Sequence, residues 1–123
     1  MNLGPDQQLH GDSPFHRATT DGYRTAVPGI RLKTLTYGDR TLLVEFRMAA
    51  GSALPGHAHP HEQTGYLVSG RIRLTIGGQS FEVGPGDSWS IGGDVEHAAE
   101  VLEEAVAIEV FSPVREDYLP ERR

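Results

Sequence analysis

The sequence predicts an all-β protein that folds as a single sandwich or barrel. Short apolar segments alternate with polar residues, and glycine and proline turns separate them at short intervals. No ten-residue stretch after residue 29 carries a helical stripe of apolar side chains. A length of 123 residues suits one domain, and 37% hydrophobic residues is enough for one compact core.

The predicted strands follow one another from Gly29 onward. Alternation is clearest in residues 30–37 and 66–76, where Ile72, Leu74 and Ile76 share one face. Gly77 and Gly78 predict a two-residue hairpin turn, because glycine accepts the positive φ that such turns require. The full set of expected strands covers residues 30–37, 41–48, 66–76, 79–83, 88–91, 97–102 and 105–111.

The chain divides into an arm and a domain. Residues 1–24 are polar, contain several glycines and prolines, and follow no period, so we expect a flexible N-terminal arm. Residues 25–123 form the predicted domain. The first residues lack the basic and apolar segments of a signal peptide, and no apolar run is long enough to span a membrane. We therefore expect a cytoplasmic protein with no membrane partner.

Composition excludes several classes of site. The chain has no cysteine, so it has neither disulfides nor thiolate metal ligands. Its net charge of −6 argues against nucleic acid as a partner, because a binding face needs clustered Lys and Arg. Any metal must therefore rest on nitrogen and oxygen ligands.

A histidine cluster predicts such a metal site. His57 and His59 are two residues apart, which on a strand places both imidazoles on one face at roughly 7 Å. Gln63 returns to that face if the chain stays extended, and His97 joins from a distant strand. We predict one divalent metal on His57, His59, Gln63 and His97, with His61 beside the site or facing solvent.

The predicted ligands are all neutral, so the ion keeps its double positive charge and acts as a Lewis acid on a hydroxyl or carbonyl. Nickel, zinc, manganese, iron and cobalt all accept three nitrogens and an oxygen, and the sequence does not distinguish them.

The spacing of these residues resembles the cupin superfamily. The first motif reads Gly51-x5-His57-x-His59-x3-Gln63-x6-Gly70, with glutamine where the superfamily usually has glutamate. The second, looser motif reads Gly86-x5-Gly92-x-Asp94-x2-His97. The resemblance implies a cupin jelly-roll barrel with the metal inside, and a homodimer.

A narrower resemblance, over residues 29–119, is to the pectin-degradation cupins, which convert 4,5-unsaturated monouronates to linear keto sugars. It rests on the His-x-His-Pro-His-Glu-Gln segment and on residues 110–118. The resemblance implies a sugar-acid substrate and places catalysis on Glu109, Phe111 and Arg115. The family usually has aspartate where this chain has Glu109.

The strand pattern fits a functional Glu109. Ala105, Ala107, Glu109 and Phe111 share one face of the last predicted strand. An unpaired carboxylate in a core is costly, so this face either lines a polar cavity or meets solvent, and we favour the cavity.

Two other functions stay open, because one fold hosts many activities. The chain could be a metal-dependent oxygenase or isomerase on the same scaffold. It could also bind a small molecule without catalysis.

Overall fold

The computed structural model describes residues 13–119 and confirms the all-β prediction. These residues form eight strands and one 3₁₀ turn at Glu116–Tyr118. The strands are β1 (Arg24–Val27), β2 (Ile30–Tyr37), β3 (Leu42–Met48), β4 (Ala53–His57), β5 (Glu62–Ile76), β6 (Gln79–Val83), β7 (Ser88–Ile91) and β8 (His97–Ser112). No helix among the described residues is long and apolar enough to cross a membrane.

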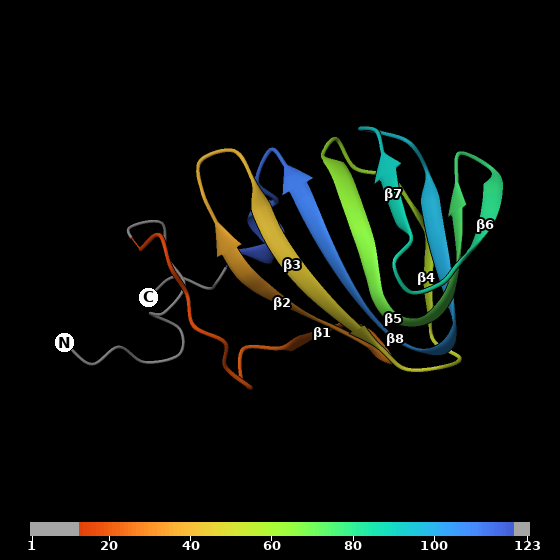
Figure 1. Cartoon of the computed structure of the whole chain (residues 1–123). Coiled ribbons are helices and arrows are strands. Elements are labelled where there is room, and N and C mark those ends of the chain that lie inside the picture. Colours follow the sequence, from red (N-terminus) through yellow and green to blue (C-terminus); the bar gives the residue numbers. More distant parts are fainter. Residues whose placement is uncertain (1–12, 120–123) are drawn as a thin grey trace.

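The two longest strands, β5 and β8, connect the two sides of the barrel (Figure 1). They pair antiparallel along nearly their whole lengths. The first half of β5 also pairs with β7. The second half of β8 also pairs with β3, and β2 and β1 follow β3 toward the edge of the sheet. The second half of β5 pairs with β6, and the first half of β8 pairs with β4. This arrangement is the expected jelly-roll barrel.

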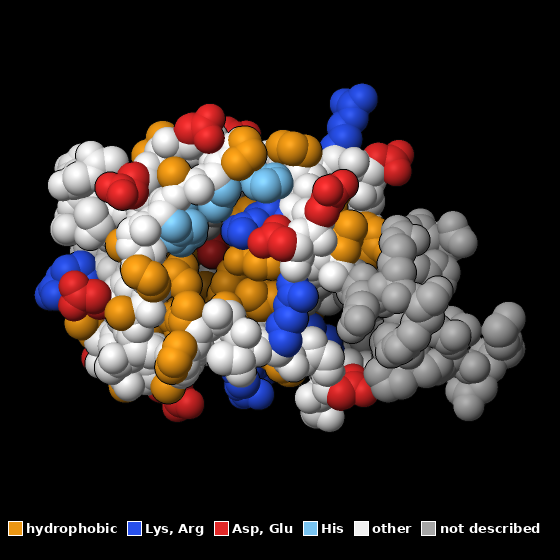
Figure 2. Space-filling view, turned by 180° about the vertical axis from the view of Figure 1, so that it is seen from behind, with side chains coloured by type: hydrophobic (Ala, Val, Ile, Leu, Met, Phe, Trp, Pro, Cys, Tyr) orange, Lys and Arg blue, Asp and Glu red, His pale blue; other side chains and the backbone are white. Residues whose placement is uncertain are grey.

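Alternation along the strands directs one set of side chains into the barrel. Leu42, Val44, Phe46 and Met48 of β3 are buried, whereas the residues between them are partly or fully exposed. Ala105, Ala107 and Phe111 of β8 are buried in the same core cluster. Figure 2 shows the back of the molecule, where histidine side chains gather at the rim of a hollow with hydrophobic walls. The barrel is therefore packed at one end and open at the other.

Four strands differ from the sequence prediction. Residues 97–102 and 105–111 belong to one continuous strand, because β8 keeps its pairing with β5 past the predicted break, with Arg71 opposite Glu103. β5 begins at Glu62 rather than at residue 66. β1 and β4 were not predicted: β1 has only four residues, and β4 contains Pro55 and Gly56, which are rare in strands.

The part of the predicted arm that the structure describes contacts the outer side of the barrel. Lys33 donates a hydrogen bond to the Thr19 carbonyl at 2.9 Å, and the Tyr23 hydroxyl donates to Glu45. Residues 1–12 lie outside the described residues. The flexibility of the arm and its boundary with the domain at residue 25 stay predictions.

Candidate metal centre

Three histidines converge at the open end of the barrel. His57 is the last residue of β4 and pairs across the sheet with His97, the first residue of β8. His59 lies two residues past the end of β4, directly before the bend at Pro60 and His61. The ligand atoms of the three imidazoles all lie within 4.8 Å of one another. This geometry is that of a three-histidine metal site.

Backbone carbonyls fix the orientation of each ring. The Nδ1 atom of His57 lies 3.0 Å from the Pro55 carbonyl, and that of His97 lies 2.9 Å from the Val95 carbonyl. The Nδ1 atom of His59 lies 3.0 Å from the carbonyl of His61. A carbonyl can only accept, so each Nδ1 carries the proton and each Nε2 keeps a lone pair for a ligand. The rings are thus oriented for metal binding by the backbone.

Electrostatics favour the neutral form of two of these histidines. Burial lowers the pKa of His59, and the positive charges of Arg115 and His97 lower it further. Burial also lowers the pKa of His97. Because a metal binds only the neutral imidazole, these shifts reduce competition from protons.

Gln63 supplies an oxygen beside the three histidines. Its Nε2 donates to Glu109 at 2.5 Å, which orients the amide and leaves Oε1 as the free end. The Gln63 Oε1 and the His59 Nε2 are both buried without a hydrogen-bond partner. Buried polar atoms without partners are rare, and a divalent cation would satisfy both. The residues at this site therefore fit the metal that the sequence predicted.

His61 lies next to the cluster and outside it. Its ring centroid is 5.5 Å from that of His59, and its ligand atoms are not among those that converge. The main contribution of His61 to the site is its carbonyl, which orients His59.

Glu109 faces the interior of the barrel, as the strand pattern predicted. It retains accessible surface where it lines a cavity of about 40 Å³ to which β2, β3, β4, β5, β7 and β8 all contribute residues. Its Oε2 accepts two hydrogen bonds, from Gln63 Nε2 and from Trp89 Nε1 at 2.9 Å. Burial raises the pKa of Glu109, although these two bonds and the charge of Arg115 oppose the rise. A carboxyl group with a raised pKa next to a candidate metal site is suited to proton transfer.

Arg115 lies where the last strand leaves the barrel, close to the histidines. It lines a cleft of about 420 Å³ together with His57, Arg24 and Tyr118. Asp117 accepts hydrogen bonds from its Nε at 3.2 Å and from one terminal nitrogen at 2.7 Å. The cleft thus places a guanidinium beside a predicted metal ligand, as recognition of an anionic substrate requires.

A profile described as a cupin domain matches residues 44–111. The chain belongs to the cupin family.

Solved structures agree with this assignment. KdgF from Halomonas sp. is 29% identical, with a TM-score of 0.76 over 79% of this chain and 90% of that one. An RmlC-like cupin from Shewanella frigidimarina is 25% identical, with a TM-score of 0.81 over 86% of this chain and 96% of that one. An oxalate decarboxylase variant from Bacillus subtilis is 25% identical, with a TM-score of 0.68 over 80% of this chain and 29% of that one. No curated protein matched the sequence.

These matches confirm the expectation of a small cupin that resembles the pectin-degradation cupins. They also include an enzyme, the oxalate decarboxylase, which favours an enzymatic role for this chain.

Phe111 is the third residue that the resemblance proposed for catalysis, and in this cupin it is fully buried. Its ring lies 6.0 Å from that of His59 and 5.4 Å from that of Tyr118, edge to face in both pairs. It pairs with Gln63 across the strands, so it packs directly behind two of the predicted ligands.

Trp89 is the residue of this site that the sequence analysis missed. Its only signal was its position in a short strand after a glycine turn, which predicts structure and no chemistry. Its hydrogen bond to Glu109 depends on strand register, which connects residues 20 positions apart.

Proposed function

We propose that this cupin converts 4,5-unsaturated monouronates to linear keto sugars, with one divalent metal on His57, His59, Gln63 and His97. The observation that carries the proposal is the position of Glu109. Its carboxyl group is bound to the amide of one predicted ligand, has a raised pKa, and lies in the barrel behind the histidines.

The metal would supply Lewis-acid polarisation of a substrate hydroxyl or carboxylate oxygen. The overall reaction is an isomerisation, which needs neither water nor a redox partner. The hydroxyl proton at C1 leaves, the bond from C1 to the ring oxygen breaks, and C1 becomes a carbonyl. The ring oxygen becomes the ketone oxygen at C5 as a proton is added at C4.

Glu109 would carry that proton. Both donors bind Oε2, so a proton held by the carboxyl group resides on Oε1, which no described residue bonds. Oε1–H can donate to C4 of the enol ether as the ring opens, and the proton released from the C1 hydroxyl restores the acid form. Burial raises the pKa of Glu109, which favours the acid form that donates this proton.

Arg115 would position the substrate, and Phe111 would support the site from behind. The guanidinium of Arg115 suits the planar carboxylate of a uronate, and the cleft that it lines also contains His57. Phe111 would form the wall behind His59 and Gln63. The likeness to KdgF at 29% identity supports the same substrate class.

The test follows the ultraviolet absorbance of the 4,5 double bond, which disappears in the reaction. Metal-loaded protein should lower the absorbance of an unsaturated monouronate, and His57→Ala should not. Glu109→Gln should lose turnover while it retains its metal, and if it retains turnover, Glu109 has no role in proton transfer.

A lack of reaction with both galacturonate- and mannuronate-derived substrates would contradict the proposal. Oxygen uptake by the iron-loaded protein would then indicate an oxygenase, and tight ligand binding without product would indicate a binding protein. The cytoplasmic location and the homodimer stay predictions.

A further inference from the structure

Trp89 reaches Glu109 across the strand that lies between them. Trp89 of β7 pairs with Gly65 of β5, and Gly65 pairs on its other side with Glu109 of β8. The indole nevertheless donates to the Glu109 Oε2 at 2.9 Å. The ring therefore crosses above the backbone of β5 on the inner face of the barrel.

Gly65 makes this crossing possible. A Cβ at position 65 would lie 2.2 Å from Cε2 of Trp89 and 2.3 Å from its Nε1, closer than any real contact. The indole thus occupies the volume in which every other residue has its side chain. Gly65 has no positive φ that would otherwise account for glycine here.

The two donors to Glu109 act on one oxygen. Gln63 Nε2 and Trp89 Nε1 both bind Oε2, at 2.5 and 2.9 Å. No described residue donates to Oε1. The first of these bonds also orients Gln63, because it engages the amide nitrogen and leaves Oε1 without a hydrogen-bond partner.

This geometry requires glutamate rather than the shorter aspartate at position 109. An aspartate would place its carboxylate about 1.5 Å closer to β8, one carbon–carbon bond short. Distances of 2.5 and 2.9 Å would then lengthen beyond the range of a good hydrogen bond. Glutamate is the acid that reaches both donors.

We propose that Trp89 is a positioning residue for Glu109. Its indole lies in the space that Gly65 leaves open, and the indole N–H binds Oε2 of Glu109. This bond requires glutamate at position 109 and leaves Oε1 available to the substrate. The part concerning catalysis rests on the proposed function, whereas the part concerning the hydrogen bond does not.

The kinetic test removes only the N–H group. Trp89 is the one tryptophan of the chain, so global replacement of tryptophan by benzothienylalanine puts sulfur at the indole nitrogen and keeps the ring's shape. We expect kcat to fall about 10- to 100-fold, as for other residues that orient a site, with KM changed less than about threefold. Trp89→Phe should behave similarly, and its unfolding curve would reveal any loss of folding.

Tyr66→Phe is the matched control. Tyr66 follows Gly65 on β5, but its side chain is on the outer face and is 49% exposed. Its loss of one hydroxyl should leave kcat unchanged. Unchanged kcat in the benzothienylalanine protein would overturn the positioning role.

A second measurement needs no substrate. Protein labelled with ¹⁵N at the indole gives a single indole N–H signal in NMR. Glu109→Ala and Glu109→Asp should both move this signal and speed its hydrogen exchange at least about tenfold, because neither side chain reaches the indole. An unchanged signal in Glu109→Asp would overturn the inference that only glutamate is long enough to reach the indole. If the wild-type protein converts no uronate, this measurement alone decides the proposal, and the failure belongs to the proposed function.

Discussion

The guanidinium of Arg115 stacks on the ring of Tyr118, with its central carbon 4.0 Å from the ring centroid. Asp117 lies between them in sequence and binds two nitrogens of the same guanidinium. Stacking and a bidentate pair together fix the plane of the group. The cleft beside His57 therefore contains an arginine whose orientation is set before any ligand arrives.

This fixed plane predicts the effect of Arg115→Lys. Lysine keeps the charge but loses the planar fork, so it neither pairs with Asp117 through two bonds nor holds a carboxylate in one orientation. We expect KM for an unsaturated uronate to rise about tenfold. Steady-state kinetics would measure it, with Arg40→Lys in an exposed turn as the control. An unchanged KM would remove Arg115 from substrate binding.

The fold was largely predictable because its strongest signals are local. Alternation in β2 and β3 and the turn at Gly77 and Gly78 each depend on neighbouring residues alone. The sequence prediction divided β8 at Glu103 and Glu104. Pairing with β5, which lies far away in sequence, carries the strand through them.

The site was predictable where residue type indicates chemistry. The histidine spacing predicted the cluster, and the alternation of β8 predicted that Glu109 faces inward. Trp89 and Gly65 could not be predicted, because neither residue type indicates a role and their contact depends on three-dimensional register.

Gly70→Ala should be one of the most destabilising glycine substitutions. Gly70 has φ +88°, and a Cβ there would lie 2.2 Å from the backbone oxygen of Glu104. Gly51 has a similar φ of +85° but open space around it, so Gly51→Ala reports the cost of the backbone conformation alone. We expect a loss of about 1–2 kcal/mol for Gly51→Ala and about 1–3 kcal/mol more for Gly70→Ala. Denaturant unfolding would measure both, and equal losses would contradict the steric argument.

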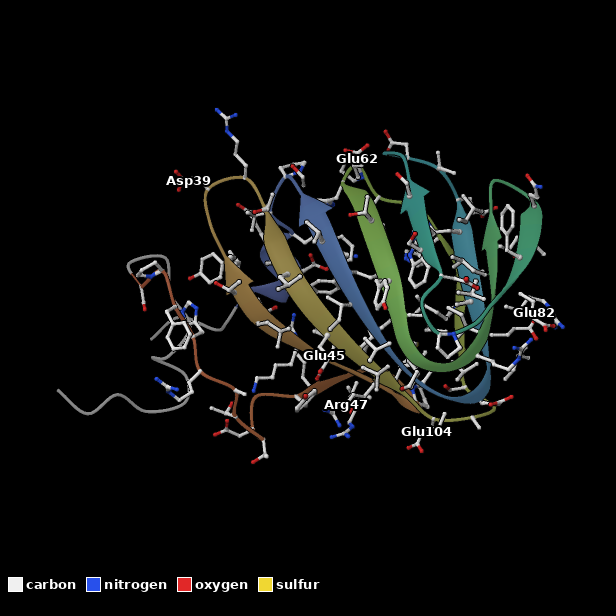
Figure 3. The ribbon with its side chains drawn as sticks, in the orientation of Figure 1. Asp39, Glu45, Arg47, Glu62, Glu82 and Glu104 are labelled. Carbon is white, nitrogen blue, oxygen red and sulfur yellow. The ribbon has the colours of Figure 1, made fainter. Side chains whose placement is uncertain are left out.

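Glu45 predicts part of the acid sensitivity of the fold. Glu45 and Arg47 are two residues apart on β3 (Figure 3). Burial acts to raise the pKa of Glu45, but hydrogen bonds from Tyr23 and Arg47 outweigh it and lower the pKa below its ordinary value. The folded pKa is below the unfolded one, so the stabilisation is complete above the unfolded value. It is lost as the pH falls through the folded value.

Glu45→Gln should therefore cost about 1–2 kcal/mol at pH 7 and much less at pH 3. Urea unfolding at the two pH values would measure the difference. Glu82→Gln is the control, because its ion pair with Arg71 is about half exposed and contributes little. A loss that is the same at both pH values would show that Glu45 acts through packing rather than charge.

Metal binding should stabilise the fold, and the histidines should differ in their contribution. With free Ni²⁺ at about 100 times its Kd, the free energy of unfolding should rise by about 2.7 kcal/mol, because the ion binds the folded state. His97→Ala should lose most of this gain, since it removes one of the three converging nitrogens. His61→Ala should keep it, because the His61 carbonyl that orients His59 is unaffected. Thermal unfolding with and without a chelator would measure the three proteins, and loss of the gain in His61→Ala would identify His61 as a ligand.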